Sequence, residues 1–307
     1  MIFDAHCDTL TALVDDNYDL YQNSGHFDIH RAMQLGGHVQ IFAAWVEPNC
    51  QNPFTRTVQK IEVVYKQISA YKDYICHVCN DEALQNVLKD KRIAAILSIE
   101  GGEALNGNIE NLTYFYNKGV RMLGLTWNGH NEIADGVGVL APAGLSIFGK
   151  ALVQRMNALG MVIDLSHIAK TGFWDVLELT SRPVAVSHSN SFSICSHVRN
   201  LSDQQFKAIV KNGGVVGVNF YTPFLSTDKM ACIDDIFKHI EHFLSLGGEN
   251  HIGFGADFDG MAQLPQGISG VEHYERLVNE MVKRNYKIQL IDKITHGNFM
   301  RLMQFNL

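Results

Sequence analysis

The chain of 307 residues carries 25 Lys and Arg against 32 Asp and Glu, which gives a formal net charge of −7 at pH 7. This acidic balance argues against a nucleic-acid partner, because such a partner requires a basic face. Hydrophobic residues (46%) and charged residues (19%) stand at the levels of ordinary globular proteins, and a chain this long can bury a large core. The sequence has no run of eighteen apolar residues and no basic leader before an apolar stretch, so we expect neither a membrane span nor a membrane anchor.

Eight apolar runs, which we predict to be β-strands, alternate with helical patterns along the chain. The runs cover residues 2–6, 39–46, 93–99, 120–126, 161–165, 184–186, 214–220 and 252–255. Helical spacing and capping signals predict helices at 54–74, 81–88, 109–118, 145–159, 171–179, 202–211 and 233–246, and a helical tail from about residue 271.

This alternation predicts the fold class. Strands separated by helices imply right-handed crossovers and a parallel sheet. Eight such units in a chain of this size predict an α/β fold, namely a closed (β/α)8 TIM barrel with extra C-terminal helices. The alternative, a doubly wound open sheet, usually carries a Gly-rich turn after its first strand, and the segment from His6 to Leu10 lacks one. No linker interrupts the pattern, so we expect residues 1–307 to form a single domain.

Six cysteines are spread along the chain, and without a signal peptide we expect them to be reduced in a cytoplasmic protein. Cys76 and Cys79 form a C-x-x-C pair, but no second pair stands at zinc-finger spacing. We therefore interpret Cys76 as a packed residue and Cys79 as the residue before a helix cap.

Residue types that bind metals follow five of the predicted strands. They are His6 and Asp8 after the first strand, Glu100 after the third, His167 after the fifth, His188 after the sixth and Asp257 after the eighth. In a barrel these positions share one face and converge near the axis. Imidazole and carboxylate suit zinc and similar ions. Two neighbouring metals need a shared ligand, and Glu100 is the one Glu in the set.

Each of these residues also has an ordinary structural interpretation when it is taken alone. A single His at a strand end is more often structural than catalytic. We interpret His239, His242 and His273, which fall in helical segments, as structural. Ligand types at five independent strand ends are hard to explain by chance, so the set as a whole favours a metal site. Cys7 alternates away from its two neighbours, and we expect it to pack between barrel and helices.

Several short segments, in order along nearly the whole chain, carry a resemblance to a known family. They are His6-x-Asp8, Ser98-Ile99-Glu100-Gly101-Gly102, Asp164-Leu165-Ser166-His167, Ser187-His188-Ser189, Arg199-Asn200, Asn219-Phe220-Tyr221, Gly255-Ala256-Asp257-Phe258-Asp259-Gly260 and Gly297-Asn298-Phe299-x-Arg301. Together they resemble the membrane (renal-type) dipeptidase family, which is part of the amidohydrolase-like barrel group. The resemblance implies a barrel metallopeptidase with two zinc ions per chain, and commonly a homodimer.

The resemblance also implies a role for each metal-binding residue type. His6 and Asp8 would bind one zinc ion. His167 and His188 would bind the other, and Glu100 would bridge the two.

For catalysis and substrate binding, the resemblance implies three further residues. Asp257 would lie near a metal-bridging hydroxide and transfer protons. Arg199 and Tyr221 would face the C-terminal carboxylate of a dipeptide, and an Arg can hold a carboxylate through two hydrogen bonds. The ordinary interpretation of Arg199 is a surface ion pair, and that of Tyr221 is a packed ring.

The chain departs from the family after the fourth predicted strand, where the family has a His that polarises the scissile carbonyl. Here Trp127 follows Thr126, and His130, three residues further on, is the candidate substitute. The ordinary interpretation of His130 is an exposed loop residue.

Taken together, the residues and the resemblance predict a metal-dependent dipeptidase, and the family often tolerates a D-residue at the second position. Two alternatives stay open. One is a related binuclear barrel hydrolase that acts on a lactam, an acyl amino acid or an ester. The other is a non-catalytic ligand-binding barrel. The same ligands also bind manganese or cobalt, so the sequence leaves the native metal open.

Overall fold

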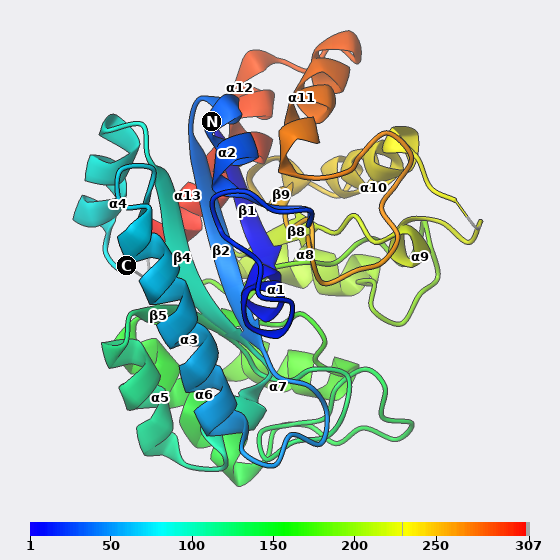
Figure 1. The fold of residues 1–307 in the computed structure, drawn as a ribbon. Helices are drawn as coiled ribbons and strands as arrows, with labels where there is room; N and C mark the ends of the chain where they lie inside the picture. Colours follow the sequence, from blue (N-terminus) through cyan, green and yellow to red (C-terminus); the bar gives the residue numbers. More distant parts are fainter. Residues whose placement is uncertain (229, 305–307) are drawn as a thin grey trace.

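The computed structural model describes residues 1–228 and 230–304, and within them nine parallel strands form one sheet in the order β2-β1-β9-β8-β7-β6-β5-β4-β3. The strands are β1 (Ile2–Cys7), β2 (His38–Trp45), β3 (Ile75–His77), β4 (Ile93–Glu100), β5 (Val120–Gly124), β6 (Val162–Asp164), β7 (Ala185–Val186), β8 (Val215–Val218) and β9 (Ile252–Phe254). Because β2 also pairs with β4, eight of them close into a barrel (Figure 1). The predicted (β/α)8 TIM barrel is confirmed.

The ninth strand, β3, was absent from the sequence prediction. It pairs with the first residues of β4, with Ile75 opposite Ile93, whereas β5 pairs with β4 only from Leu97 onward. The strand β3 therefore occupies the part of the β4 edge that β5 leaves free.

Helices follow the barrel strands and surround the barrel (Figure 1). They are α1 (Thr9–Asp15), α2 (Ile29–Ala32), α3 (Pro53–Ala70), α4 (Asp81–Lys89), α5 (Ile109–Asn117), α6 (Ile147–Leu159), α7 (Lys170–Leu179), α8 (Asp203–Asn212), α9 (Thr222–Leu225), α10 (Ile233–Ser245), α11 (Tyr274–Lys283), α12 (Ile288–Asp292) and α13 (Asn298–Gln304). Local chemistry explains their bounds. A capping box of Ser202 and Gln205 begins α8, and Gly160, in the left-handed conformation with φ 73°, ends α6.

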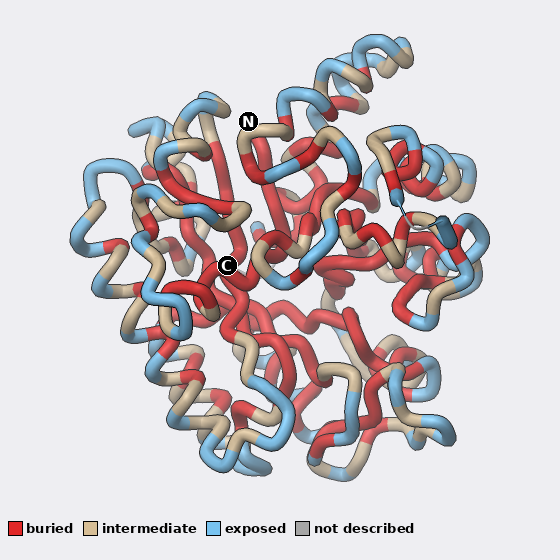
Figure 2. Tube along the Cα trace, turned by 45° about the vertical axis from the view of Figure 1, so that its right-hand side comes forward, coloured by how far each residue is buried: buried red, intermediate tan, exposed pale blue. Residues whose placement is uncertain are grey.

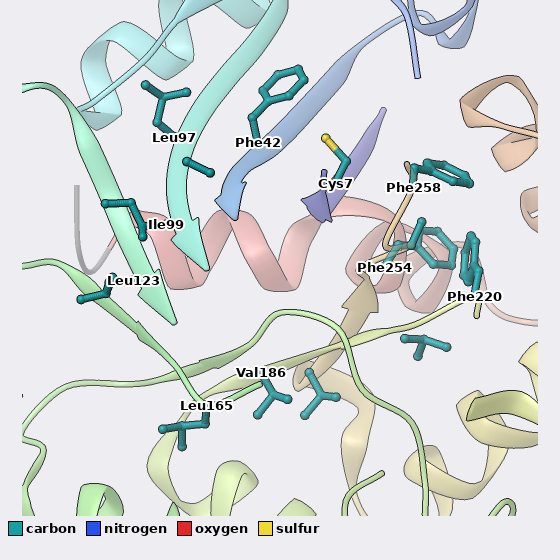
Figure 3. Packing of buried hydrophobic residues seen from close by; sticks show 14 of the residues in the cluster. Cys7, Phe42, Leu97, Ile99, Leu123, Leu165, Val186, Phe220, Phe254 and Phe258 are labelled. Atoms are coloured by element: carbon teal, nitrogen blue, oxygen red, sulfur yellow. The ribbon is translucent and has the colours of Figure 1, made fainter. Parts of the chain in front are cut away.

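Strand alternation divides the core into two layers. In β4, Ala94 and Ile96 belong to a cluster that fills the barrel, whereas Leu97 and Ile99 belong to the cluster under the helices (Figure 3). Figure 2 shows the barrel strands as almost continuously buried. The alternation places Glu100 on the inward stripe, at the last residue of β4.

The C-terminal helix α13 closes the amino-terminal end of the barrel. The ring of Phe299 stacks on that of Phe3 with centroids 5.4 Å apart. A Cβ at Gly253 would lie 2.6 Å from the same ring, so only glycine fits there. The opposite, carboxyl-terminal end stays free for a site, as in other barrels of this type.

A β-bulge in β1 sets the direction of the first candidate ligand. Asp4 lies opposite Gln40 and Cys7 opposite Phe42, so three steps along β1 match two along β2. Bulges of this kind re-aim side chains. Cys7 is fully buried and packs in the outer layer with Phe42, which confirms its predicted role (Figure 3).

Two other sequence predictions concern the state of the cysteines and the absence of a membrane span. All six cysteines are unpaired, and Cys76 packs against the barrel cluster. Within the described residues, no helix combines the length and the apolar character that a membrane crossing requires.

Candidate metal centre

Six buried or nearly buried side chains meet at the carboxyl-terminal end of the barrel. They are His6 in β1, Asp8 at the start of α1, Glu100 at the end of β4, and His167, His188 and Asp257 after β6, β7 and β9. Their ligand atoms form three overlapping groups, each within 4.8 Å, that could hold a metal ion. These are the same six residues that the sequence analysis placed at the ends of predicted strands.

Glu100 lies between two groups of ligands. Its Oε1 is 2.8 Å from His167 Nε2 and 3.6 Å from His188 Nε2. Its Oε2 faces the other way, 3.3 Å from His6 Nε2. His6 Nε2 is in turn 3.3 Å from Asp8 Oδ2. One carboxylate thus offers an oxygen to each half of the site, which is the geometry that a bridging ligand requires.

A second layer of side chains fixes the orientation of two imidazoles. His167 Nδ1 lies 2.8 Å from Asn128 Oδ1, and His188 Nδ1 lies 2.7 Å from Ser187 Oγ. When each Nδ1 carries the proton, each Nε2 presents its lone pair to the centre of the site. Asn128 was not predicted from the sequence, because it lies in a loop with no motif of its own.

Three residues of the site region have left-handed backbones. Positive φ angles occur at His167 (68°), Asp257 (67°) and Asp259 (64°). Such angles are uncommon for non-glycine residues and cluster at functional sites. Asp259 is held by Thr9 Oγ1 at 2.7 Å and by the backbone N–H of His26 at 2.6 Å. These contacts secure the turn that carries Asp257.

Burial and neighbouring positive charge together lower the pKa values of two imidazoles of the site. Burial, together with Arg199, lowers the pKa of His167 to about 4. Burial, with His6 and Arg199, lowers the pKa of His188 well below its usual range. Neutral imidazole is the form that binds a metal.

The pKa values of the carboxyl groups of Glu100 and Asp257 are shifted in opposite directions. Burial opposes the charge of Glu100, but His6 and His167 overcome this and hold its pKa well below the usual range. Burial raises the pKa of Asp257 well above the usual range; Asp8 and Glu100 add to the rise and His6 opposes it. One carboxyl is therefore fixed as an anion, and the other holds a proton readily.

A cavity of ≈ 350 Å³, here called the main cavity, opens above these residues. Its lining includes Asp8, Glu100, His167 and Asp257, and also Tyr221, Trp45, Trp127, Asn128 and Phe224. Tyr221 therefore faces the site. Arg199 lies behind Phe224, with its guanidinium carbon 5.5 Å from the centre of that ring. Arg199 is buried and donates to His188 O and Ser189 Oγ. Among the described residues, carboxylates act on it only at longer range, from Asp257, Glu100 and Asp164. A surface ion pair is thus the wrong interpretation of Arg199.

His130 lies outside the main cavity. Its side chain is 77% exposed, and its Nδ1 pairs with Asp135 Oδ1 at 2.6 Å. Trp127 lines the cavity instead, with its ring 5.5 Å from that of Trp45 and 6.1 Å from that of His167. The geometry favours the ordinary interpretation of His130 as a loop residue.

The barrel and the buried His and carboxylate set define a metal-dependent hydrolase. The chain matches the membrane dipeptidase family, peptidase family M19, over residues 1–305, and it belongs to that family of metal-dependent dipeptidases. It is 34% identical to a Klebsiella pneumoniae protein from the 5′ region of pqqA, over 80% of this chain and 96% of the relative. It is 33% identical to the uncharacterized dipeptidase C965.12 of Schizosaccharomyces pombe, over 91% of this chain and 72% of the relative.

Solved structures agree with this assignment. A metallopeptidase of Rhodobacter sphaeroides, liganded with a phosphinate mimic of the dipeptide L-Ala-D-Ala, has a TM-score of 0.92 at 26% identity and covers 100% of this chain and 99% of its own. The metallopeptidase called dipeptidase AC has a TM-score of 0.91 at 27% identity and covers 99% and 98%. The predicted family is confirmed.

Proposed function

We propose that the protein hydrolyses dipeptides, including those with a C-terminal D-residue, at a binuclear zinc site. The observation that supports this most directly is the position of Glu100, with one carboxylate oxygen toward His167 and His188 and the other toward His6. The Rhodobacter sphaeroides relative, which was solved with a mimic of L-Ala-D-Ala, supports the substrate class.

The donor set fits two zinc ions. His6 and Asp8 would hold one ion, His167 and His188 the other, and Glu100 would bridge them. When bound, such ions polarise the peptide carbonyl and lower the pKa of a water toward neutral.

Asp257 is positioned to transfer protons in the reaction. Asn219 Nδ2 donates to Asp257 Oδ2 at 2.9 Å, so Oδ1 stays directed toward the ligands, 3.9 Å from His6 Nε2. Asp257 would accept the proton of the attacking water and deliver it to the leaving amine. Its raised pKa suits an acid–base residue.

Arg199 and Tyr221 would hold the carboxylate of the substrate. Arg199 Nε is buried without a hydrogen-bond partner, so the guanidinium retains a donor for a ligand. The carboxylate of a short peptide would satisfy this donor, which restricts substrates to those with a nearby C-terminus.

The test is the rate of hydrolysis by the zinc-loaded protein on a panel of L-Ala-L-Ala, L-Ala-D-Ala, a lactam, an N-acyl amino acid and an ester. We expect the dipeptides to have the highest kcat/KM. Faster hydrolysis of the lactam, acyl amino acid or ester would instead support a related barrel hydrolase. Zinc binding without any turnover would support a ligand-binding barrel.

We propose further that residues 1–307 are one domain, and that the protein is a cytoplasmic homodimer. The continuous barrel supports the first point, and the six unpaired cysteines are in line with a reducing compartment. The homodimer rests on the resemblance to the family alone.

A further inference from the structure

A second cavity of ≈ 380 Å³, here called the side cavity, adjoins the metal centre. It lies between the first turn of α7 and the loop that joins β7 to α8, and it shares His167 with the main cavity. Its size falls in the range of about 300–1,000 Å³ that is typical of small-molecule sites. A substrate in the main cavity could therefore extend past His167 into this space.

The two cavities differ in the charged side chains that line them. The main cavity is lined by the carboxylates of Asp8, Glu100, Asp257 and Asp259 and by no Lys or Arg among the described residues. The side cavity is lined by Lys170 and Arg199 and, within the same described ranges, by no carboxylate. The carboxylate of a dipeptide that spans both would lie at the cationic Arg199, with the peptide bond toward the metal-binding residues of the main cavity.

The remaining walls of the side cavity are mostly apolar. They include Val137, Ile168, Phe173, Phe192, Val198 and Leu201. Phe173 is fully buried and gives a fixed wall, whereas Phe192 (45% exposed) and Val198 (65% exposed) stand at the open end. Burial of a large apolar group between such walls is favourable.

We propose that the side cavity is the subsite for the side chain of the C-terminal residue of the dipeptide, and that it selects large apolar side chains over small or cationic ones. This inference rests on the proposed dipeptidase function. Arg199 fixes the carboxylate from the wall of the side cavity, and the side chain on the same carbon enters the apolar space beside it. Lys170 and Arg199 repel a C-terminal lysine.

The experiment compares kcat/KM of the zinc-loaded enzyme for Ala-Phe, Ala-Ala, Ala-Lys and the reversed dipeptide Phe-Ala. We expect Ala-Phe to exceed Ala-Ala by roughly tenfold or more, because apolar pockets discriminate by about that factor. We expect Ala-Lys to be the poorest of the four and Phe-Ala to gain no comparable advantage.

Two variants at exposed positions then test the cavity itself. Phe192→Ala should lower the ratio of Ala-Phe to Ala-Ala by roughly fivefold, and Lys170→Glu should raise the ratio of Ala-Lys to Ala-Ala. Ile147→Ala is the matched control, because Ile147 is an apolar residue, 91% exposed, that lines neither cavity. Its ratios should equal those of the wild type.

Two results would overturn the inference while leaving the dipeptidase function intact. One is equal hydrolysis of Ala-Phe and Ala-Ala by the wild type. The other is a wild-type preference that neither variant alters. Failure to hydrolyse any dipeptide would be a different result, which would overturn the proposed function together with the subsite.

Discussion

Asp164 accepts two hydrogen bonds from Ser187, one from the backbone N–H to Oδ1 at 2.8 Å and one from the hydroxyl to Oδ2 at 2.5 Å. Because the hydroxyl proton points to Asp164, Ser187 Oγ can only accept from Nδ1–H of His188, 2.7 Å away. This arrangement selects the tautomer of His188 in which Nε2 is free to bind a metal.

Removal of the Ser187 hydroxyl should therefore weaken zinc binding. We expect Ser187→Ala to lower the affinity for zinc by roughly 10- to 100-fold, as is usual for the loss of such partners. Competition with a chromogenic chelator measures the affinity. Ser245→Ala, which removes an exposed hydroxyl on α10, is the control and should bind zinc as the wild type does. Unchanged affinity in Ser187→Ala would show that the tautomer is fixed in another way.

Asp257→Asn should leave the metal in place and impair the chemistry. The amide cannot take a proton from water, so we expect kcat to fall by roughly 10²- to 10⁴-fold with little change in bound zinc. Steady-state kinetics measure kcat, and elemental analysis of the same protein measures the bound zinc. A variant with full activity would remove Asp257 from the mechanism.

The raised pKa of Asp257 has a consequence for stability. In the unfolded chain the carboxyl titrates near its ordinary pKa of about 3.9. The folded pKa is higher, so at pH values between the two pKa values the folded state still holds a proton that the unfolded state has lost. The stability of the protein therefore falls as the pH rises through this range. The charge of Asp257 therefore costs stability at pH 8 and nothing below the unfolded pKa.

In chelator-treated protein, Asp257→Asn should accordingly raise the Tm at pH 8 by roughly 2 °C or more, with the gain disappearing toward pH 3.5. Thermal unfolding at several pH values measures the difference. Asp73→Asn, at an exposed position, is the matched control and should show no such trend. A loss of Tm in Asp257→Asn at pH 8 would contradict the assigned direction.

Gly260 follows the turn of Asp257 and Asp259, and it makes a further test of the geometry. A Cβ at this position would collide with the carboxylates of Asp8 and Asp257. We expect Gly260→Ala to fold but to lose most of its bound zinc and activity. Gly129→Ala is the control, because nothing lies within 4 Å of its added Cβ. Normal zinc content in Gly260→Ala would mean that the two carboxylates tolerate displacement.

The sequence predicted the barrel because each of its eight strands is an apolar run between helical patterns. It did not predict β3, since Ile75–His77 has only three residues and exists because β5 leaves part of β4 unpaired. The short helices α1, α2 and α9 were also not predicted. They span seven, four and four residues, too few for a periodic pattern.

The candidate ligands were found because barrel topology brings strand ends together, so a residue type at each end was sufficient. Their partners were not found in the same way. Asn128 and His167 are 39 residues apart in the sequence, and Asp164 and Ser187 are 23 apart. No local sequence pattern predicts either contact. The side cavity depends on how a loop lies against a helix, which sequence spacing does not determine.

The zinc content per chain of the wild type and of Glu100→Gln, determined by mass spectrometry after dialysis, tests whether Glu100 bridges two metal ions. We expect two zinc ions in the wild type and the loss of both in Glu100→Gln, since the amide cannot bridge. Glu103→Gln, the same change at a Glu outside the ligand groups, should keep two. Two ions retained by Glu100→Gln, or fewer than two in the wild type, would contradict this bridging role.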